Sequence, residues 1–372
     1  MHINTLNLTN FRNYENLEIK PDIGLNVLVG MNAQGKSAVL EAIYLLATSK
    51  SHRTSRDMDL IRLGEGVAWV CAEAVRSERN DVILEIALSR TEAKTVKINK
   101  VKHLKIGDIV GQLNAVIFSN SDIEMVRGEP SLRRRFLNLE ISQVSPQYIY
   151  ALGRYKRVLS QRNNLLKEIK SSRLQSADID AWDGQLAEYG AVIISRRAKF
   201  ISFLAESAAR IYSSLTDNAE ELKVTYKPNI DAGLKSSEKE TAAKFAKILI
   251  ARREMDIMRG TTTSGPHRDD ISLSVNGLAA REFASQGQQR SIAIALKLAE
   301  IDLMSQSVGE SPVVLLDDVM AELDDARRAR VLEVTLGRCQ TFITTTSLDE
   351  IGRSGVDRAK VFDVRSGKVA AR

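Results

Sequence analysis

The spacing of apolar and polar residues changes several times along this chain, and each spacing predicts a different kind of element. Up to residue 30, apolar residues largely alternate with polar ones, as in half-buried strands, and residues 25–29 are apolar enough for a buried strand. A glycine-bearing loop then leads into residues 38–46, whose apolar composition predicts a buried helix. Residues 67–88, 94–99 and 116–118 again have the character of strands, so the first 120 residues predict an α/β unit.

In the middle of the chain, apolar residues instead follow the periodicity of a helix. No proline occurs between Pro146 and Pro228, and apolar residues recur at helical spacing, as at Leu152, Tyr155 and Leu159. The heptad register is too poorly sustained, and the segment is too short, for a long coiled-coil arm. We therefore expect an all-helical insertion here.

The last part of the chain returns to an alternation of strands and helices. These elements are expected at 271–275, 291–303, 313–316, 326–336 and 341–344. Such alternation is typical of a parallel sheet with crossover helices. The predicted fold class is α/β, with a mixed-sheet head made of residues 1–120 and 263–372 and an inserted all-helical lobe over residues 121–262.

Composition bounds the class of protein. The 372 residues, 44% hydrophobic and 27% charged, are typical of a globular chain of two or three domains. No apolar run reaches the roughly 18 residues of a membrane span, and the first residues lack a secretory signal. Cys71 and Cys339 stand apart, which favours a reducing, cytoplasmic location over a disulfide framework. The histidines form no ligand-spaced pair, so no zinc site is expected.

Basic residues are in excess, and they gather in one segment. Lysine and arginine number 53 against 47 acids, and between residues 127 and 170 ten basic residues face only three acidic ones. Two interpretations stay open for this segment: a solvated helical face, or a track for the phosphate backbone of a nucleic acid.

One loop carries a phosphate-binding pattern. It consists of Gly30, Met31, Asn32, Ala33, Gln34, Gly35, Lys36 and Ser37. An apolar strand precedes the loop and a helix follows it, as this pattern requires, which makes a chance glycine turn a poor explanation. The backbone N–H groups of such a loop wrap the β-phosphate of ATP, Lys36 reaches the β- and γ-phosphates, and Ser37 ligates Mg²⁺.

Two acids at the end of a later strand are expected to complete this site. Residues 313–316 are aliphatic, and Asp317 and Asp318 follow them directly. We expect Asp317 to hold Mg²⁺, directly or through water, and Asp318 to orient or deprotonate the attacking water. Lys36 and Asp318 are thus the predicted catalytic residues. A strand that merely ends in acids is the simpler interpretation, but a phosphate loop needs such a partner.

A polar segment ahead of a long apolar helix offers a second surface for a nucleotide. It consists of Ser285, Gln286, Gly287 and Gln288. Ser285 as an N-cap and Gln288 three residues later form a capping-box pattern, which by itself would explain them. A serine, a glycine and two amides at a helix N-terminus also suit an anion.

This segment resembles the signature of ABC-type ATPases, because it comes shortly before the strand that ends at Asp317, and Ala321–Asp324 resembles their D-loop. Asn10–Tyr14 resembles the opening strand of the RecF and structural-maintenance-of-chromosomes group. Segments similar to those of the RecF family follow in the family's order: Phe118–Asp122, Val126–Leu137, Gly265–Asp270, Ser285–Ser291 and Leu316–Asp324. Because these motifs extend over nearly the whole chain, it is identified as a member of that family with an ABC-type ATPase head.

The resemblance implies a weak, ATP-dependent DNA-binding ATPase of recombinational repair and replication-fork maintenance. It implies a homodimer in which the phosphate loop of one subunit and the signature of the other enclose each ATP and its Mg²⁺. It also implies double-stranded or gapped DNA as a partner, and action with RecR and RecO to load RecA. The candidates for DNA contact are Arg127, Arg133, Arg134, Arg135, Arg154, Lys156 and Arg157. The arginines at 133–135 equally suit a brace between head and lobe.

Two features indicate a slow switch and not a fast motor. Asp318 stands where most ABC-type ATPases carry glutamate, as it does in the RecF family, and Thr344–Thr346 include no histidine for the γ-phosphate. The Q-loop residue stays unassigned. Gln112 is close in sequence, but the segment 118–122 fits the family better.

Three other classes of protein share part of this pattern. A transporter ATPase has the same motifs, but the inserted lobe and the Asn10–Arg12 strand fit it poorly. A nuclease of the overcoming-lysogenization type carries a similar head followed by an acidic metal domain, for which the residues after the last strand leave no room. A small-molecule kinase would explain the phosphate loop but not the segment Ser285–Gln288.

Overall fold

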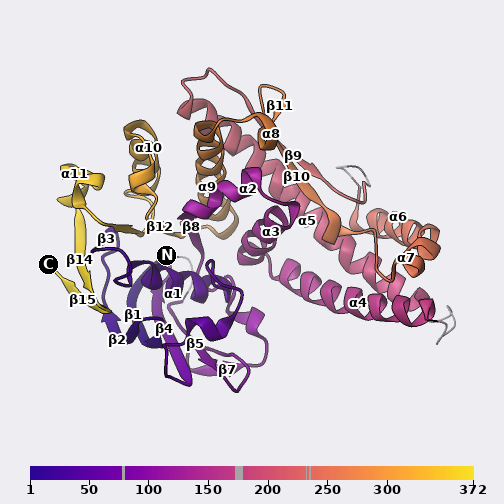
Figure 1. Ribbon diagram of the computed structural model, residues 1–372, viewed down its shortest axis with the longest axis horizontal. Coiled ribbons are helices and arrows are strands. Elements are labelled where there is room, and N and C mark those ends of the chain that lie inside the picture. The colour runs from indigo at the N-terminus through magenta and orange to yellow at the C-terminus, as the bar shows by residue number, and fades with distance from the viewer. Residues whose placement is uncertain (78–79, 172–178, 232, 234–235) are drawn as a thin grey trace. The chain divides into compact units, whose positions relative to one another are not determined.

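The chain folds into two units, each built from segments that are distant in sequence (Figure 1). The computed structural model describes residues 1–77, 80–171, 179–231, 233 and 236–372. The unit that we call the head comprises Met1–Ile123, Ile211–Ala219 and Gln286–Arg372. The unit that we call the lobe comprises Glu124–Arg210 and Glu220–Ser285.

One sheet of the head is antiparallel, with strand order β2-β1-β4-β5-β6-β7. Its strands are β1 (His2–Phe11), β2 (Tyr14–Ile19), β4 (Val67–Val75), β5 (Val82–Ser89), β6 (Thr95–Ile98) and β7 (Val101–His103). Every second residue of β5, starting at Val82, is buried, because side chains alternate between the two faces of a sheet and only one face meets the core. The alternation in the sequence therefore predicts most of these strands, but the sequence did not predict β7 or a separate antiparallel sheet.

The second sheet of the head has strand order β15-β14-β3-β13-β12-β8 and is parallel except for β15. Its strands are β3 (Leu25–Val29), β8 (Ala115–Ser119), β12 (Val313–Asp317), β13 (Thr341–Thr345), β14 (Ala359–Arg365) and β15 (Lys368–Ala371). All five residues of β3 are buried, as expected for a strand with both faces covered, and this explains its unbroken apolar run.

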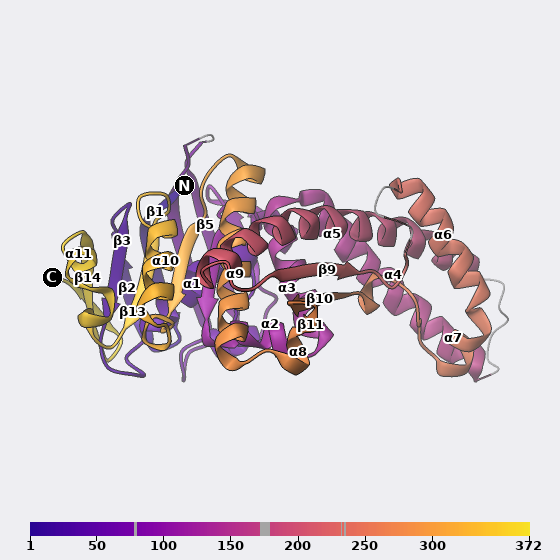
Figure 2. The same cartoon turned by 90° about the horizontal axis from the view of Figure 1, so that it is seen from above.

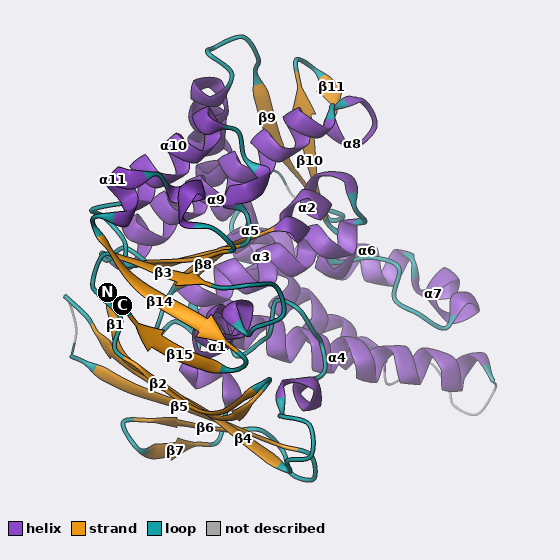
Figure 3. Cartoon of the chain, turned by 60° about the vertical axis from the view of Figure 1, so that its left-hand side comes forward, coloured by secondary structure: helices purple, strands orange, loops and turns teal. Residues whose placement is uncertain are grey.

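The helix α1 (Lys36–Thr48) lies between the two sheets (Figure 3). It packs against β4 and β5 of the antiparallel sheet and against β8, β12 and β13 of the parallel sheet. With apolar neighbours on both sides, every residue of α1 except Ser37 is buried. The head also contains α9 (Gln286–Val308), α10 (Asp325–Thr335) and α11 (Arg353–Val356).

The lobe is mainly helical. Its helices are α2 (Ile123–Arg127), α3 (Pro130–Val144), α4 (Pro146–Lys170), α5 (Ile179–Leu215), α6 (Glu238–Ala251), α7 (Arg253–Arg259) and α8 (Ala280–Phe283), with the first residue of α2 and the last turn of α5 assigned to the head. Within the described residues, no helix combines the length and the apolarity that crossing a membrane demands.

The expectation of an all-helical lobe is wrong. The strand β9 (Leu222–Lys227) lies inside the segment expected to be helical, and it pairs with β10 (Asp270–Val275), which pairs in turn with β11 (Leu278–Ala279). Figure 2 shows β9 and β10 alongside α5. In β9 the buried residues Leu222, Val224 and Tyr226 alternate with more exposed ones. This alternation lasts for only six residues and follows a long helix, so it is too short to be recognised from the sequence.

The boundary of the lobe differs from the expected residue 262 for the same reason. The strand at 271–275 was expected in the head, but its partner β9 belongs to the lobe, and the lobe therefore extends to Ser285. A strand joins the sheet that completes its backbone hydrogen bonds, and that partner is set by tertiary pairing, which periodicity along the sequence does not encode.

Candidate nucleotide-binding site

The candidate site lies at the carboxyl edge of the parallel sheet. Val29 at the end of β3 pairs with Thr345 of β13, and Thr344 of β13 pairs with Asp317 of β12. Because the three strands run parallel, the loop after β3 and the acids after β12 leave the sheet at the same edge, where open α/β sheets bind their ligands. One intervening strand thus separates the two halves of the predicted site.

Gly35 closes the phosphate loop, Gly30–Ser37. Its φ is 117°, a backbone conformation that favours glycine, and a Cβ at this position would lie 2.5 Å from Nδ2 of Asn13 and displace that side chain. The hydroxyl of Tyr14 donates a hydrogen bond to the Gly35 carbonyl oxygen at 3.1 Å. The helix α1 begins at the next residue, so the positive end of its dipole faces the loop and favours an anion there.

Lys36 places a positive charge inside this loop. Its side chain is buried, and Nζ donates to the carbonyl oxygens of Gly30 at 2.7 Å and of Met31 at 3.1 Å. Asn32 and Ala33 are exposed, so the middle of the loop is accessible to a ligand. An ammonium group in a loop of this kind is suited to phosphate oxygens.

Asp317 receives polar contacts from three directions. The hydroxyl of Thr344 donates to Oδ1 at 3.0 Å, Nε2 of His52 lies 3.6 Å from Oδ2, and the side chain of Ser37 lies beside the carboxylate. Burial alone would raise the pKa of Asp317, but the contacts with His52, Ser37 and Thr344 outweigh it and lower that pKa. Asp317 is therefore held as a carboxylate beside the serine of the phosphate loop.

Asp318 has a strained backbone and a different electrostatic environment. Its φ is 57°, unusual for a residue with a Cβ, and its backbone N–H donates to the hydroxyl of Thr344 at 2.8 Å. Burial raises the pKa of Asp318, opposed by Lys36, and the neighbouring acids Asp317, Glu350 and Glu322 raise it further. Thr344 thus supports both acids of the pair.

Ser37 and Asp317 provide oxygen donors of the kind that Mg²⁺ prefers. Among the described residues, no cluster of three or more His, Cys, Asp and Glu side chains is placed to hold a metal ion. Mg²⁺ demands six ligands in near-octahedral geometry and commonly takes phosphate oxygens and waters among them. The residues present fit a metal ion that arrives together with a nucleotide.

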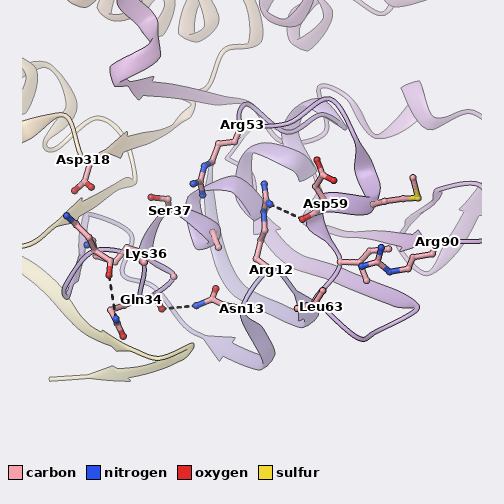
Figure 4. Close-up of a pocket in the computed structure, with 16 residues that line it drawn as sticks. Arg12, Asn13, Gln34, Lys36, Ser37, Arg53, Asp59, Leu63, Arg90 and Asp318 are labelled. Carbon is pink, nitrogen blue, oxygen red and sulfur yellow. Dashed lines mark hydrogen bonds between the residues drawn. The ribbon is translucent and has the colours of Figure 1, made fainter.

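A pocket opens beside the phosphate loop, wholly within the head (Figure 4). The loop residues Asn32–Ala38 and Asp318 line one part of it. The other part combines cationic, polar and apolar side chains with one acid: Arg12, Asn13, Arg53, Arg90, Met58, Asp59, Ile61 and Leu63. Such a combination offers cations for phosphates and apolar surface for a base.

Sequence reasoning assigned no role at this site to Arg12, His52, Arg53 or Arg90. The guanidinium of Arg12 forms two hydrogen bonds with the buried carboxylate of Glu41, at 2.7 and 2.8 Å. Arg12 belongs to a segment that resembles the RecF family, which was the one signal that pointed to it. The other three lie outside any motif and reach the site only through the tertiary fold.

The signature residues lie at the start of α9. Ser285, the last residue of the lobe, and Gln286 and Gly287 at the start of the helix are exposed, and Gln288 is partly so. The pocket described above is lined by none of Gln286, Gly287 or Gln288, all three of which are described residues. Their assignment to the nucleotide of a second subunit stays a prediction.

The start of α9 is tied to the D-loop, Ala321–Asp324, within the head. Arg290 contacts the Glu322 carboxylate at 3.2 Å. Arg327, whose backbone N–H is capped by the Asp324 side chain, donates two hydrogen bonds to the hydroxyl of Ser291, at 2.8 and 2.9 Å. Two arginines therefore hold the signature helix and the D-loop together.

The candidate DNA contacts in the lobe fall into two groups. Arg133 is buried, bonds both carboxylate oxygens of Asp270 at 2.7 and 3.0 Å, and donates to two backbone carbonyl oxygens. Arg134, half-buried, donates to the carbonyl oxygen of Asp269 at 2.9 Å. The expectation that Arg133 contacts DNA is wrong, because its donors are used inside the lobe.

The hydrogen bonds of Arg133 and Arg134 do not support the alternative that these arginines brace the head against the lobe. Asp269 and Asp270 both belong to the lobe, so Arg133 and Arg134 join two segments of one unit. The exposed candidates are Arg127, Arg135, Arg154, Lys156 and Arg157. Arg127 is paired with Glu124 at 2.5 Å. These five remain predictions.

Comparison with known proteins agrees with this geometry. Residues 2–369 match the family described as RecF/RecN/SMC N terminal domain. The chain is 41% identical, over the full length of both proteins, to the DNA replication and repair protein RecF of Geobacillus thermodenitrificans (strain NG80-2). The chain belongs to the RecF family.

Solved structures extend this result to the fold. A structure described as the recombination mediator protein RecF-ATP in the RecFOR pathway matches with a TM-score of 0.92 and 34% identity, covering 100% of this chain and 97% of the other. An Smc head domain from Pyrococcus furiosus matches with a TM-score of 0.57 and 16% identity, covering 100% and 96%. The predicted RecF resemblance and the ABC-type head are therefore confirmed.

Proposed function

We propose that this chain is an ATP-dependent DNA-binding protein of recombinational repair whose two copies close around ATP and Mg²⁺. The observation that carries the nucleotide part is that Ser37 of the phosphate loop lies beside the Asp317 carboxylate, next to the buried ammonium of Lys36. It joins the two predicted halves of a phosphate and metal site in one place. The name RecF-ATP of the similar structure also supports ATP as the ligand.

In this proposal each residue at the sheet edge has one task. The backbone N–H groups of Gly30–Ser37 and the ammonium of Lys36 bind the phosphates, and Ser37 and Asp317 hold Mg²⁺. The metal ion would neutralise charge that develops on the phosphates. Asp318 accepts a proton from the attacking water or orients it. The short side chain of Asp318 and the lack of a histidine in Thr344–Thr346 favour slow hydrolysis.

Dimerisation follows from the second nucleotide surface. Ser285, Gln286, Gly287 and Gln288 would bind the ATP held by the partner's phosphate loop, which would make ATP part of the interface. Their exposure supports this assignment. The contacts of Arg290 and Arg327 with the D-loop would then transmit closure of the interface to the residues after Asp318.

DNA is the proposed macromolecular partner. The lobe presents exposed cations along α4, including Arg154 and Arg157, and a positive surface of this kind binds phosphate backbones in a salt-dependent manner. The RecF family suggests gapped or double-stranded DNA, with RecR and RecO acting alongside to load RecA in the cytoplasm. The RecFOR pathway named for the similar structure supports this setting.

The decisive experiment is analytical sedimentation of the chain alone, with ATP, and with ATP plus a gapped duplex. The proposal expects a monomer alone, a dimer with ATP and Mg²⁺, and a larger species on DNA. Ser285→Arg should bind ATP but stay monomeric, because the long side chain blocks the partner's nucleotide. Ser307→Arg, at the exposed far end of the same helix, is the control and should dimerise. A Ser285→Arg protein that dimerises normally would contradict the sandwich.

Asp318→Asn tests the hydrolytic role. Removing the proton acceptor should slow turnover and leave the closed, DNA-bound dimer longer-lived. Phosphate release and the dissociation rate from gapped DNA measure these two effects. Faster hydrolysis in this variant would refute the assigned role.

A further inference from the structure

His52 is a largely buried side chain at the metal side of the site, and no motif accounts for it. Its side chain is 10% exposed, and neither ring nitrogen has a hydrogen-bond partner. Its ring meets that of Tyr44 edge to face, with centroids 5.7 Å apart. Because a buried donor without a partner is destabilising, an imidazole at this position calls for a reason.

The loop that carries His52 is held firmly in place. Glu41, fully buried on α1, accepts a hydrogen bond from the hydroxyl of Ser51 at 2.5 Å. The same hydroxyl accepts from the backbone N–H groups of Arg53 at 2.9 Å and Thr54 at 3.1 Å. These bonds fix the backbone beside His52, and the edge-to-face contact with Tyr44 packs against its ring and gives the ring its direction.

That direction is toward the carboxylate of Asp317. Nε2 of His52 lies 3.6 Å from Oδ2, while Thr344 donates to Oδ1 at 3.0 Å. The gap to Oδ2 exceeds a hydrogen bond by a few tenths of an ångström. A small rotation of the carboxylate closes it, and a neutral imidazole with its hydrogen on Nε2 is a sufficient donor.

Carboxylates that bind metal ions are themselves oriented by hydrogen bonds from residues behind them. Asp317 already has one such partner in Thr344, which acts on one oxygen only. With a second donor on the other oxygen, the plane of the carboxylate is fixed. His52 is the buried group at the correct side for this task.

We propose that His52 is a positioning residue for the metal ion of the nucleotide site, donating from Nε2 to Oδ2 of Asp317 and so fixing the carboxylate beside Ser37. This inference rests on the proposed Mg²⁺–ATP site. It assigns to the residue after Ser51 a role in metal affinity that is separate from binding of the phosphates. The alternative is that His52 only fills space against Tyr44.

The two roles differ in how nucleotide binding depends on metal. A fluorescent ATP analogue is titrated into the full-length protein in EDTA and then over a range of Mg²⁺ concentrations. In His52→Ala the Mg²⁺ concentration at half-saturation should rise by about 10- to 100-fold, as for other residues that orient metal ligands. Affinity in EDTA should stay within about twofold of the natural protein, because the phosphate loop is untouched.

A rescue variant and a control separate positioning from packing. His52→Gln can place an N–H near Oδ2 and should restore most of the metal affinity. His103→Ala removes a histidine that pairs with Asp108 in the same unit and should leave both titrations unchanged. Thermal unfolding of each variant verifies that the head remains folded.

Each outcome decides something. A half-saturating Mg²⁺ concentration that does not move in His52→Ala overturns the proposal and leaves the nucleotide site standing. Equal losses of affinity with and without Mg²⁺ assign His52 to packing alone and also overturn it. If the natural protein binds no analogue under either condition, the proposed nucleotide site fails first, and the role of His52 fails with it.

Discussion

The head and the lobe use arginine in opposite ways. In the head, Arg12 and Arg53 line the pocket beside the phosphate loop, with side chains 24% and 49% exposed. In the lobe, Arg162 and Arg197 are fully buried. A count of basic residues treats all four alike. Only the first pair lies where an anionic ligand would meet it.

The buried arginines connect distant segments of the lobe. Arg197 donates to the hydroxyl of Tyr148, the side chains of Asn138 and Asp269, and the carbonyl oxygen of Pro266, at 2.6 to 3.0 Å. Arg162 does the same for Asp183, Asp256 and Thr262, at 2.6 to 2.8 Å. A planar guanidinium with five donors is well suited to such a junction. Because both side chains are buried, these arginines are structural elements of the lobe and not surface charges.

The largest effect that tests this contrast is expected at Arg197. Arg197→Met leaves the buried carboxylate of Asp269 without its cation, which should lower the free energy of unfolding by about 3–5 kcal/mol. Urea denaturation followed by circular dichroism measures the loss. The exposed Arg157→Met should change the free energy by less than about 0.5 kcal/mol. A stable Arg197→Met protein that fails only in DNA binding would break the comparison.

The next largest effect concerns the head and should appear in binding. Lys36→Met removes the buried cation of the phosphate loop, so the affinity for ATP should fall by about 2–5 kcal/mol, roughly 30- to 4000-fold. Calorimetric titration with Mg²⁺–ATP measures this. Lys97→Met removes an exposed lysine of the same unit, paired with Glu85, and should bind ATP normally. Unchanged affinity in Lys36→Met would place the nucleotide elsewhere.

A smaller effect is expected from pH in the lobe. Burial lowers the pKa of His267 below its usual 6.5, and the nearby Arg268 and Arg134 lower it further. Nε2 lies 3.1 Å from the carbonyl oxygen of Thr262, so it must donate, and Nδ1 accepts the hydroxyl of Tyr155 at 2.6 Å. Protonation at Nδ1 breaks that second bond.

The sign of this pH dependence follows from linkage. Below about pH 6.5 the unfolded chain binds a proton that the folded lobe resists, so the free energy of unfolding should fall as the pH drops. Urea denaturation between pH 5 and 8 measures the slope. In His267→Gln this dependence of the unfolding free energy on pH should disappear. An equal slope in both proteins would mean that other groups cause it.

The smallest effect is expected in the salt dependence of DNA binding, and it distinguishes exposed from buried arginines of the lobe. If Arg157 contacts a phosphate, Arg157→Ala should make the slope of log affinity for DNA against log salt shallower by about 1. Filter binding or fluorescence anisotropy over a range of salt concentrations measures this slope. Arg133→Ala should lose stability and keep the slope. The reverse result for the two variants would contradict the assignment of Arg133 to the interior.

The sequence alone determined those parts of the site that depend on neighbouring residues. A strand, a glycine loop and a helix in succession form a phosphate loop at Gly30–Ser37 because each step is a local choice of backbone conformation. Four aliphatic residues ahead of Asp317 likewise predict a buried strand that ends in an acid. The alternating strands and helices also predicted the parallel sheet that brings these ends to one edge.

Only the tertiary structure decided which partner each remaining residue meets. The pairing of β9 with β10, the burial of Arg133 against Asp270 and the approach of His52 to Asp317 all join segments more than 40 residues apart. Such contacts depend on how whole elements pack, because packing brings distant residues together without any periodic signal in the sequence. Arginine, one type of side chain, therefore lines a pocket in the head and lies inside the core of the lobe.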